Sequence, residues 1–236
     1  SGMSGMSDMG GMSGMSGMGG MSGMGGTAGP AVPRQKVVYH LNGDDPAGPR
    51  IIRELNCRYV TFGFSEQADI RPLKAVFGPE GIRATLQTPR GRLEFQSRLL
   101  GRFNLLNIMA AASSALVNGV GAERIAAALA SFRPVKGRAS VAHAGDFLVV
   151  VDYAHTDDAL ENLLRSFREI ARGRLILVFG AGGSRDKSKR PRMGRVASRF
   201  ADRVVLTSDN PRQEDPLAIL ADVQSGFEPG FAAWRS

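Results

Sequence analysis

The chain has 236 residues, of which 43% are hydrophobic, and its formal net charge is +8. This length allows one or two domains. The lysines and arginines cluster in loops beside predicted strands and aromatic residues make up only 7%, so an anionic small molecule is favoured as the partner and nucleic acid is not expected. No apolar run reaches the roughly 18 residues of a membrane span.

The single cysteine, Cys57, excludes a disulfide within the chain and suits a reducing compartment, so we expect a cytoplasmic protein. We interpret Cys57 as a buried, unreactive thiol. The histidines His40, His143 and His155 lack the spacing of a zinc site, and no metal site is predicted.

Residues 1–26 are almost entirely serine, glycine and methionine, with methionine at every third position from Met3 to Met24. We expect this segment to be disordered, because glycine is costly to order and little apolar surface offsets that cost. A thioether site for Cu(I) is the open alternative. Residues 27–36 contain prolines and are predicted to be a linker, so the first region spans residues 1–36.

Residues 37–136 are predicted to contain strands, a helix, a hairpin and two alanine-rich helices. The hairpin is indicated by alternating apolar residues on both sides of Pro89-Arg90-Gly91. The predicted strands are Val37–Leu41, Arg58–Gly63, Ile82–Thr88 and Arg92–Ser97, and the predicted helices are Pro49–Asn56, Ile108–Asn118 and Ala122–Ser131.

Residues 137–236 alternate strands with helices, which predicts a doubly wound, Rossmann-like parallel sheet. Three strands are few for a free-standing sheet of this class. The predicted strands are Phe147–Asp152, Arg174–Gly180 and Arg203–Thr207, and the predicted helices are Thr156–Ala171, Arg190–Phe200 and Pro216–Gly226.

Polar or glycine-rich residues follow each of these three strands. Open α/β sheets bind ligands at the carboxyl ends of their strands, and arginines and lysines there indicate phosphates or carboxylates. The polar residues are Asp152, His155, Arg185, Lys187, Arg190, Asp209 and Arg212.

The glycine-rich segment 180–188 is not a P-loop. The motif G-x-x-x-x-G-K-[ST] needs glycine directly before the lysine, and Asp186 stands there; the motif occurs nowhere else in the chain. Two interpretations remain open: a turn with solvated charges, or an anion-binding loop in which Arg185 and Lys187 supply charge.

In the segment Asp209-Asn210-Pro211-Arg212, proline fixes the turn and so holds Asn210 and Arg212 in place. An amide beside a guanidinium suits the ammonium and carboxylate of an amino acid. The alternative is an Asx-turn with a solvent-facing arginine.

Two weaker patterns complete the candidate residues. Asp152 and His155 suit a ribose or Mg²⁺ contact, although an aspartate at a strand end also forms turns. Asn104 and Asn107 are three residues apart and share a helix face, where Asn104 suits a cap and Asn107 a nucleotide base edge.

Together the blocks resemble the Mur ligase family, in particular its members that add diaminopimelate. The resemblance implies an α/β protein in which 37–136 is the second half of a central ATPase-type domain and 137–236 an incomplete C-terminal domain. The matching blocks are N-G-D-D-P (42–46), L-L-G-R-F-N-L-L-N (99–107), V-K-G-R (135–138), V-D-Y-A-H-T (151–156), G-G-S-R-D-K-S-K-R-P-R-M-G (182–194) and T-S-D-N-P-R (207–212).

The resemblance further implies an ATP- and Mg²⁺-dependent ligase of peptidoglycan synthesis. It would add meso-diaminopimelate to UDP-N-acetylmuramoyl-L-alanyl-D-glutamate through an acyl phosphate. By the resemblance, ATP would be held by Asn104, Asn107, Arg138, Asp152, His155 and Lys187, and the incoming amino acid by Arg185, Asp209, Asn210 and Arg212.

Lysine-adding relatives lack the arginine at position 212, which favours diaminopimelate as the substrate. Ser184 and Ser188 depart from the family, which often has aspartate and glycine there. The family's P-loop and catalytic residues lie upstream of the matching part, so we expect this chain alone to be inactive. The alternative from another class is a non-catalytic nucleotide-binding or interaction domain.

Overall fold

The structure, a computed structural model, describes residues 38–235. The predicted disorder and the possible Cu(I) site of residues 1–36 lie outside that range. Within it, no helix combines the length and apolar character that a membrane crossing requires.

The first elements form a small parallel unit. Strand β1 (Val38–Asn42) pairs in parallel with β2 (Arg58–Phe62), and helix α1 (Gly48–Glu54) connects them. Pro49 lies in the first turn of α1, where its missing N–H costs nothing. These three elements confirm the sequence prediction to within two residues at each end.

Three antiparallel strands follow: β3 (Arg71–Gly78), β4 (Gly81–Thr88) and β5 (Gly91–Ser97). The predicted hairpin is confirmed, because Thr88 pairs with Gly91 across the turn. Strand β3 was missed. Its pairing with β4 shifts at a bulge beside Pro72, and this irregularity hides the alternation that would reveal a strand.

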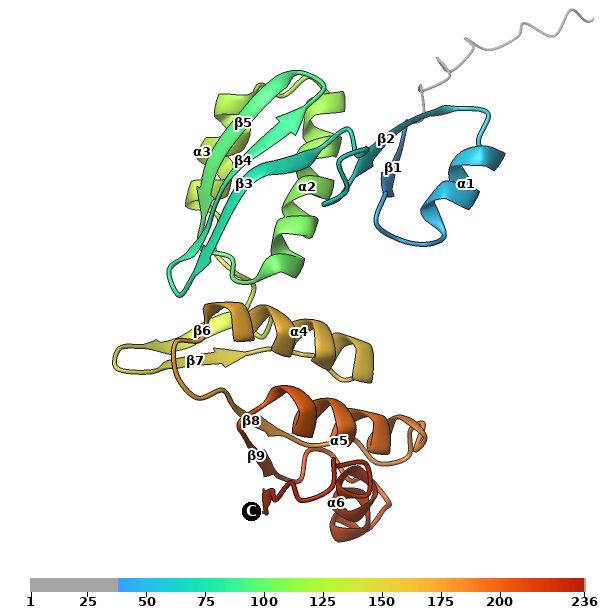
Figure 1. The fold of residues 1–236 in the computed structure, drawn as a ribbon, viewed down its shortest axis with the longest axis vertical. Helices are drawn as coiled ribbons and strands as arrows, with labels where there is room; N and C mark the ends of the chain where they lie inside the picture. The colour runs from blue at the N-terminus through green and yellow to red at the C-terminus, as the bar shows by residue number, and fades with distance from the viewer. Residues whose placement is uncertain (1–37, 236) are drawn as a thin grey trace, which may run out of the picture. The chain divides into compact units, whose positions relative to one another are not determined.

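Helices α2 (Arg102–Val117) and α3 (Ala122–Ser131) cover one face of this sheet (Figure 1). Alternate residues of β4 and β5 pack against the buried stripe of α2. Helix α2 begins six residues earlier than predicted, after Gly101, whose φ of 84° suits glycine. The core consists of Phe62, Ile70, Ile82, Ala84, Leu86, Leu93, Phe95, Leu105, Ile108, Met109, Ala112, Leu116 and Ile125.

The last hundred residues open with an antiparallel hairpin. Strand β6 (Ser140–Ala144) pairs with β7 (Leu148–Val151). The second of these strands was predicted as a member of the parallel sheet, and that placement is wrong. The turn Gly145-Asp146 lets the chain fold back, so the hydrogen bonds of β7 go to its immediate predecessor.

A parallel sheet follows, with strand order β10-β9-β8. It contains β8 (Ile176–Phe179), β9 (Arg203–Leu206) and the two-residue β10 (Trp234–Arg235), joined by helices α5 (Lys189–Phe200) and α6 (Pro216–Gln224). Figure 1 shows the helices and strands of this region following one another along the chain. The alternation of strands and helices was predicted, whereas β10 was not, because two residues carry no periodicity.

Helix α4 (Asp157–Ile170) precedes this sheet and begins at an N-cap. The Thr156 hydroxyl accepts a hydrogen bond from the Ala159 amide at 3.2 Å. Leu160 and Leu164 of α4 pack with Met193 of α5 in a buried cluster. The helices thereby stabilise the strands whose carboxyl ends carry the polar loops.

The prediction for Cys57 is wrong, because this residue is exposed. It lies in the short turn between α1 and β2, where the chain reverses at the surface. Loops of this kind run over the surface because their backbone groups need solvent.

Candidate functional site

Two loops at the carboxyl ends of β8 and β9, residues 180–188 and 207–215, are bound to each other; we call them the paired loops. The Gly183 amide donates to the Asn210 carbonyl at 2.8 Å, and Arg212 Nη1 donates to the Gly183 carbonyl at 2.8 Å. A Cβ atom on Gly183 would lie 1.8 Å from the Pro211 carbonyl oxygen. Only glycine therefore permits this approach of the two backbones.

One residue in each loop has a left-handed backbone. Ser184 has φ 51° and Arg212 has φ 52°, a region that residues with a side chain seldom adopt. Such conformations persist where surrounding contacts over-determine them, and they cluster at ligand sites. Here the contacts between the loops supply that constraint.

The predicted amino-acid residues Arg185, Asp209, Asn210 and Arg212 all lie on the paired loops and are exposed. One guanidinium nitrogen of Arg212 is held by Gly183, which fixes the orientation of the fork while the other nitrogens remain accessible. The Asx-turn interpretation is not supported, since no described hydrogen bond involves the side chain of Asp209 or Asn210. The geometry suits an anionic carboxylate ligand.

Arg190 lies beneath these loops. It was predicted among the polar residues that face a ligand, but its side chain is buried. Nη1 donates to Glu214 at 3.0 Å and to Asp222 at 2.9 Å, and Nη2 donates to the Gly182 carbonyl at 3.2 Å and to Glu214 at 2.9 Å. Its Nε has no hydrogen-bond partner among the described residues. The two terminal nitrogens of Arg190 are therefore bound by protein groups rather than by a ligand.

Glu214 joins both loops. Besides Arg190, its carboxylate accepts hydrogen bonds from the Ser184 amide and from Lys187 Nζ, the latter at 3.0 Å. Hydrogen bonds from Arg190, then from Ser184 and Lys187, lower the pKa of Glu214 to about 2. The predicted ATP ligand Lys187 thus has its charge balanced within the loops.

A second cluster gathers around the end of β7. The Arg138 guanidinium lies 5.0 Å from the ring centroid of Tyr153, and that ring lies 5.0 Å from the His155 ring. Asp152 accepts hydrogen bonds from the Ala139 and Ala154 amides, both at 2.8 Å. The structure thus brings together Arg138, Asp152 and His155, which come from two separate sequence blocks, while the Asp152 carboxylate also holds the local backbone.

This second cluster adjoins the start of α5, because Lys189 Nζ donates to the His155 carbonyl at 2.8 Å. Exposed Arg138 beside the Tyr153 ring suits a phosphate and a ribose or base. The fit to Mg²⁺ is poorer. Between residues 38 and 235 no group of three histidine, cysteine or acidic side chains is placed to hold a metal ion.

The two predicted asparagines lie in the first turns of α2. Asn107 Nδ2 donates to Asn104 Oδ1 at 3.3 Å, which confirms that they share a face. Asn104 is buried and donates to the Leu100 carbonyl at 2.8 Å, so it does not cap the helix. It orients Asn107, which is exposed.

A surface cavity of about 240 Å³ lies in the first half of the chain, lined mainly by apolar side chains including Tyr59, Ile70 and Leu116. None of the predicted site residues lines it. The candidate site is therefore a set of surface loops rather than this cavity.

Sequence reasoning placed Arg190 among the ligand-facing residues, which is wrong because it is buried, and it missed Glu214 and Asp222. The helical periodicity of α5 could have indicated that Arg190 is buried. The buried residues of this helix are Arg190, Met193, Gly194 and Ala197, so the arginine lies on the apolar stripe. A charged residue on such a stripe needs a buried partner. No comparable pattern marks Glu214.

Parallel strands joined by helices, with arginine-bearing loops at their carboxyl ends, define an α/β protein whose loops suit anionic ligands. Comparison with known families then gives two matches, the Mur ligase middle domain over residues 32–115 and the Mur ligase glutamate ligase domain over residues 137–234. The chain belongs to the Mur ligase family.

Similar proteins include the UDP-N-acetylmuramoyl-L-alanyl-D-glutamate–2,6-diaminopimelate ligases of Gloeobacter violaceus and Geobacillus kaustophilus. The first is 50% identical over 194 residues (81% of this chain, 40% of the relative) and the second 43% identical over 187 residues (79% and 38%). The chain thus spans about 40% of the length of the curated relatives it matches.

Solved structures agree on the fold. A 2,6-diaminopimelate ligase of the same name superposes with a TM-score of 0.57 at 32% identity, covering 84% of this chain and 42% of that one. Mycobacterium tuberculosis folylpolyglutamate synthase, solved with ADP, gives 0.69 at 18% identity, covering 86% and 46%.

Proposed function

We propose that this chain is the part of a Mur ligase that holds the incoming diaminopimelate and one side of ATP. The complete reaction joins meso-diaminopimelate to UDP-N-acetylmuramoyl-L-alanyl-D-glutamate, with ATP activating the carboxylate. The observation that carries the proposal is Arg212, an exposed arginine held by Gly183 in a left-handed turn. The similar proteins of Gloeobacter violaceus and Geobacillus kaustophilus are named as 2,6-diaminopimelate ligases, which supports diaminopimelate as the amino acid.

Arg212 is suited to select diaminopimelate over lysine. The two amino acids share a backbone and an amine and differ by one side-chain carboxylate, which a planar guanidinium binds in bidentate fashion. Asn210 and Asp209 are assigned to the amino-acid head group, and Arg185 adds a second positive charge. Lysine offers nothing for this fork to hold.

ATP is assigned to the other cluster. Arg138 contacts the phosphates, His155 and Asp152 lie toward the ribose, and Asn107, oriented by Asn104, reads the adenine. Lys187 is assigned to the phosphates as well, in competition with Glu214. Mg²⁺ belongs to the proposal through the nucleotide, and this chain's described residues supply no complete set of ligands for it.

The organisation proposed from the sequence is retained. Residues 37–136 are assigned to the second half of the central domain and 137–236 to the C-terminal domain, which is supported by family matches at 32–115 and 137–234. A cytoplasmic location is proposed because ATP and UDP-linked substrates are used. No role for nucleic acid is proposed.

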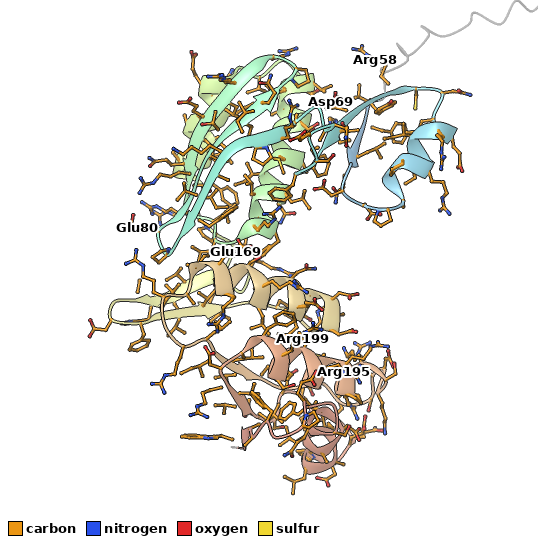
Figure 2. The ribbon with its side chains drawn as sticks, in the orientation of Figure 1. Arg58, Asp69, Glu80, Glu169, Arg195 and Arg199 are labelled. Atoms are coloured by element: carbon orange, nitrogen blue, oxygen red, sulfur yellow. The ribbon has the colours of Figure 1, made fainter. Side chains whose placement is uncertain are left out.

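The test is a chimera in which residues 38–235 replace their counterpart in the Gloeobacter violaceus ligase. Charge-assisted hydrogen bonds contribute on the order of 1.5–3 kcal/mol, so Arg212→Ala should lower kcat/KM for diaminopimelate roughly 10- to 100-fold. Use of lysine should change far less. Arg195→Ala is the matched control, because this exposed arginine of α5, labelled in Figure 2, lies outside the paired loops. An equal loss for both amino acids would show that Arg212 is structural.

A further inference from the structure

Three consecutive residues of the first paired loop are each bound through their backbone by groups from elsewhere. The carbonyl of Gly182 accepts from Arg190, that of Gly183 accepts from Arg212, and the amide of Ser184 donates to Glu214. The middle contact fixes the guanidinium assigned to the substrate. Its position therefore depends on the two contacts that flank it.

Both flanking contacts lead to the same ion pair. Arg190 holds Gly182 with Nη2, and the same nitrogen donates to Glu214. Glu214 holds Ser184 and lies two residues after Arg212 in the second loop. The pair thus joins the loops through one buried charge and one partly buried charge, with side-chain exposures of 1% and 18%.

We propose that Glu214 and Arg190 are positioning residues that hold Arg212 in the orientation needed to bind the side-chain carboxylate of diaminopimelate. This inference rests on the proposed function of Arg212. Neither residue contacts the ligand: the Arg190 side chain is buried, and the Glu214 carboxylate is occupied by protein donors and would repel an anionic group.

Asp222 provides an internal comparison. It is the other carboxylate bound to Arg190, at 2.9 Å, but it comes from α6 and makes no described contact with the 180–188 loop. If the network only compensated a buried arginine, both carboxylates would matter alike. If it positions the loops, Glu214 matters and Asp222 does not.

The experiment uses the isotope-labelled 236-residue chain and its Glu214→Gln and Asp222→Asn variants, with Glu161→Gln as control. Glu161 also pairs with an arginine, Arg165 at 2.7 Å, but at the surface of α4. The ligand-free readouts are amide exchange at Gly183 and Ser184 and the Arg212 guanidinium resonances. Of these three variants, we expect only Glu214→Gln to accelerate amide exchange at Gly183 and Ser184, by about tenfold or more, because a charged hydrogen bond is lost. The same variant should shift the Arg212 guanidinium resonances.

The ligand readout is titration with meso-diaminopimelate and, separately, lysine. Glu214→Gln should weaken diaminopimelate binding about tenfold and leave lysine binding unchanged. Arg190→Lys, which keeps the charge but loses the fork, should reproduce this effect, and it decides the matter if Glu214→Gln does not fold.

The inference would be overturned if Glu214→Gln and Asp222→Asn accelerated amide exchange equally. It would also be overturned if Glu214→Gln changed neither the amide exchange of Gly183 nor the Arg212 resonances. If the unmodified chain bound neither amino acid, the proposed function would fail, whereas the exchange and resonance arms would still decide whether the ion pair positions Arg212. Those two failures are therefore distinguishable.

Discussion

Replacing Gly183 by alanine tests the contact on which the paired loops depend. The new Cβ would lie 1.8 Å from the Pro211 carbonyl oxygen and 2.6 Å from its carbon, and both are backbone atoms that cannot rotate away. The loops must separate, which breaks the Gly183–Asn210 and Arg212–Gly183 hydrogen bonds. Gly182 is the matched control, because a Cβ there would meet only the Asn210 carbonyl oxygen at 3.8 Å.

The magnitude follows from two contributions. Forcing a methyl group into a packed site costs about 1–3 kcal/mol, and each lost hydrogen bond about 0.5–1.5 kcal/mol. Because two hydrogen bonds are lost, Gly183→Ala should lower the free energy of unfolding by about 2–6 kcal/mol, measured by urea denaturation. Gly182→Ala should lie within about 1 kcal/mol of the unmodified chain. Equal effects of the two substitutions would refute the close approach of the loops.

Two further predictions concern the titration of Glu214 and the hydrolysis of ATP. The pKa of Glu214 is about 2 in the folded chain and near 4.5 when unfolded, so its stabilisation is complete above pH 4.5 and is lost as the pH falls toward 2. The urea midpoint of unfolding should thus fall more steeply between pH 4.5 and 2 in the unmodified chain than in Glu214→Gln. If the midpoint depended on pH in the same way in both proteins, the lowered pKa of Glu214 would be contradicted. The 236-residue chain, which lacks a P-loop sequence, should release no phosphate from ATP and Mg²⁺ above the blank, with the full-length Gloeobacter violaceus ligase as positive control. Release above the blank would show that other residues orient the γ-phosphate.

The sequence predicted most of the elements that have a strong period or clear boundaries. Helix α4 follows its N-cap Thr156, and the hairpin of β4 and β5 follows its turn residues. The failures have physical causes. A bulge disguises β3, β6 is mostly exposed, and the partner of β7 is set by a turn rather than by its own apolar run.

The site was predicted unevenly for a related reason. The residues proposed to bind the ligand, Arg185, Asn210 and Arg212, lie in the loops that follow two strands, so they could be chosen from local sequence. The residues that position the loops come from distant parts of the sequence. Glu214 and Arg190 are 24 positions apart, and their pairing depends on how the two loops meet. Local sequence patterns do not contain that information. They also do not predict the left-handed backbone of Ser184 and Arg212, because serine and arginine seldom adopt it.

The proposed function requires that the paired loops bind diaminopimelate through Arg212. The most direct measurement is a titration of the isotope-labelled 236-residue chain with meso-diaminopimelate and with lysine, following the backbone and guanidinium resonances of Arg212 and the amide of Asn210. If the proposed function is right, we expect saturable shifts with diaminopimelate, at least about tenfold weaker binding of lysine, and loss of that preference in Arg212→Ala. Identical titrations with both amino acids, or a preference that survives Arg212→Ala, would contradict it.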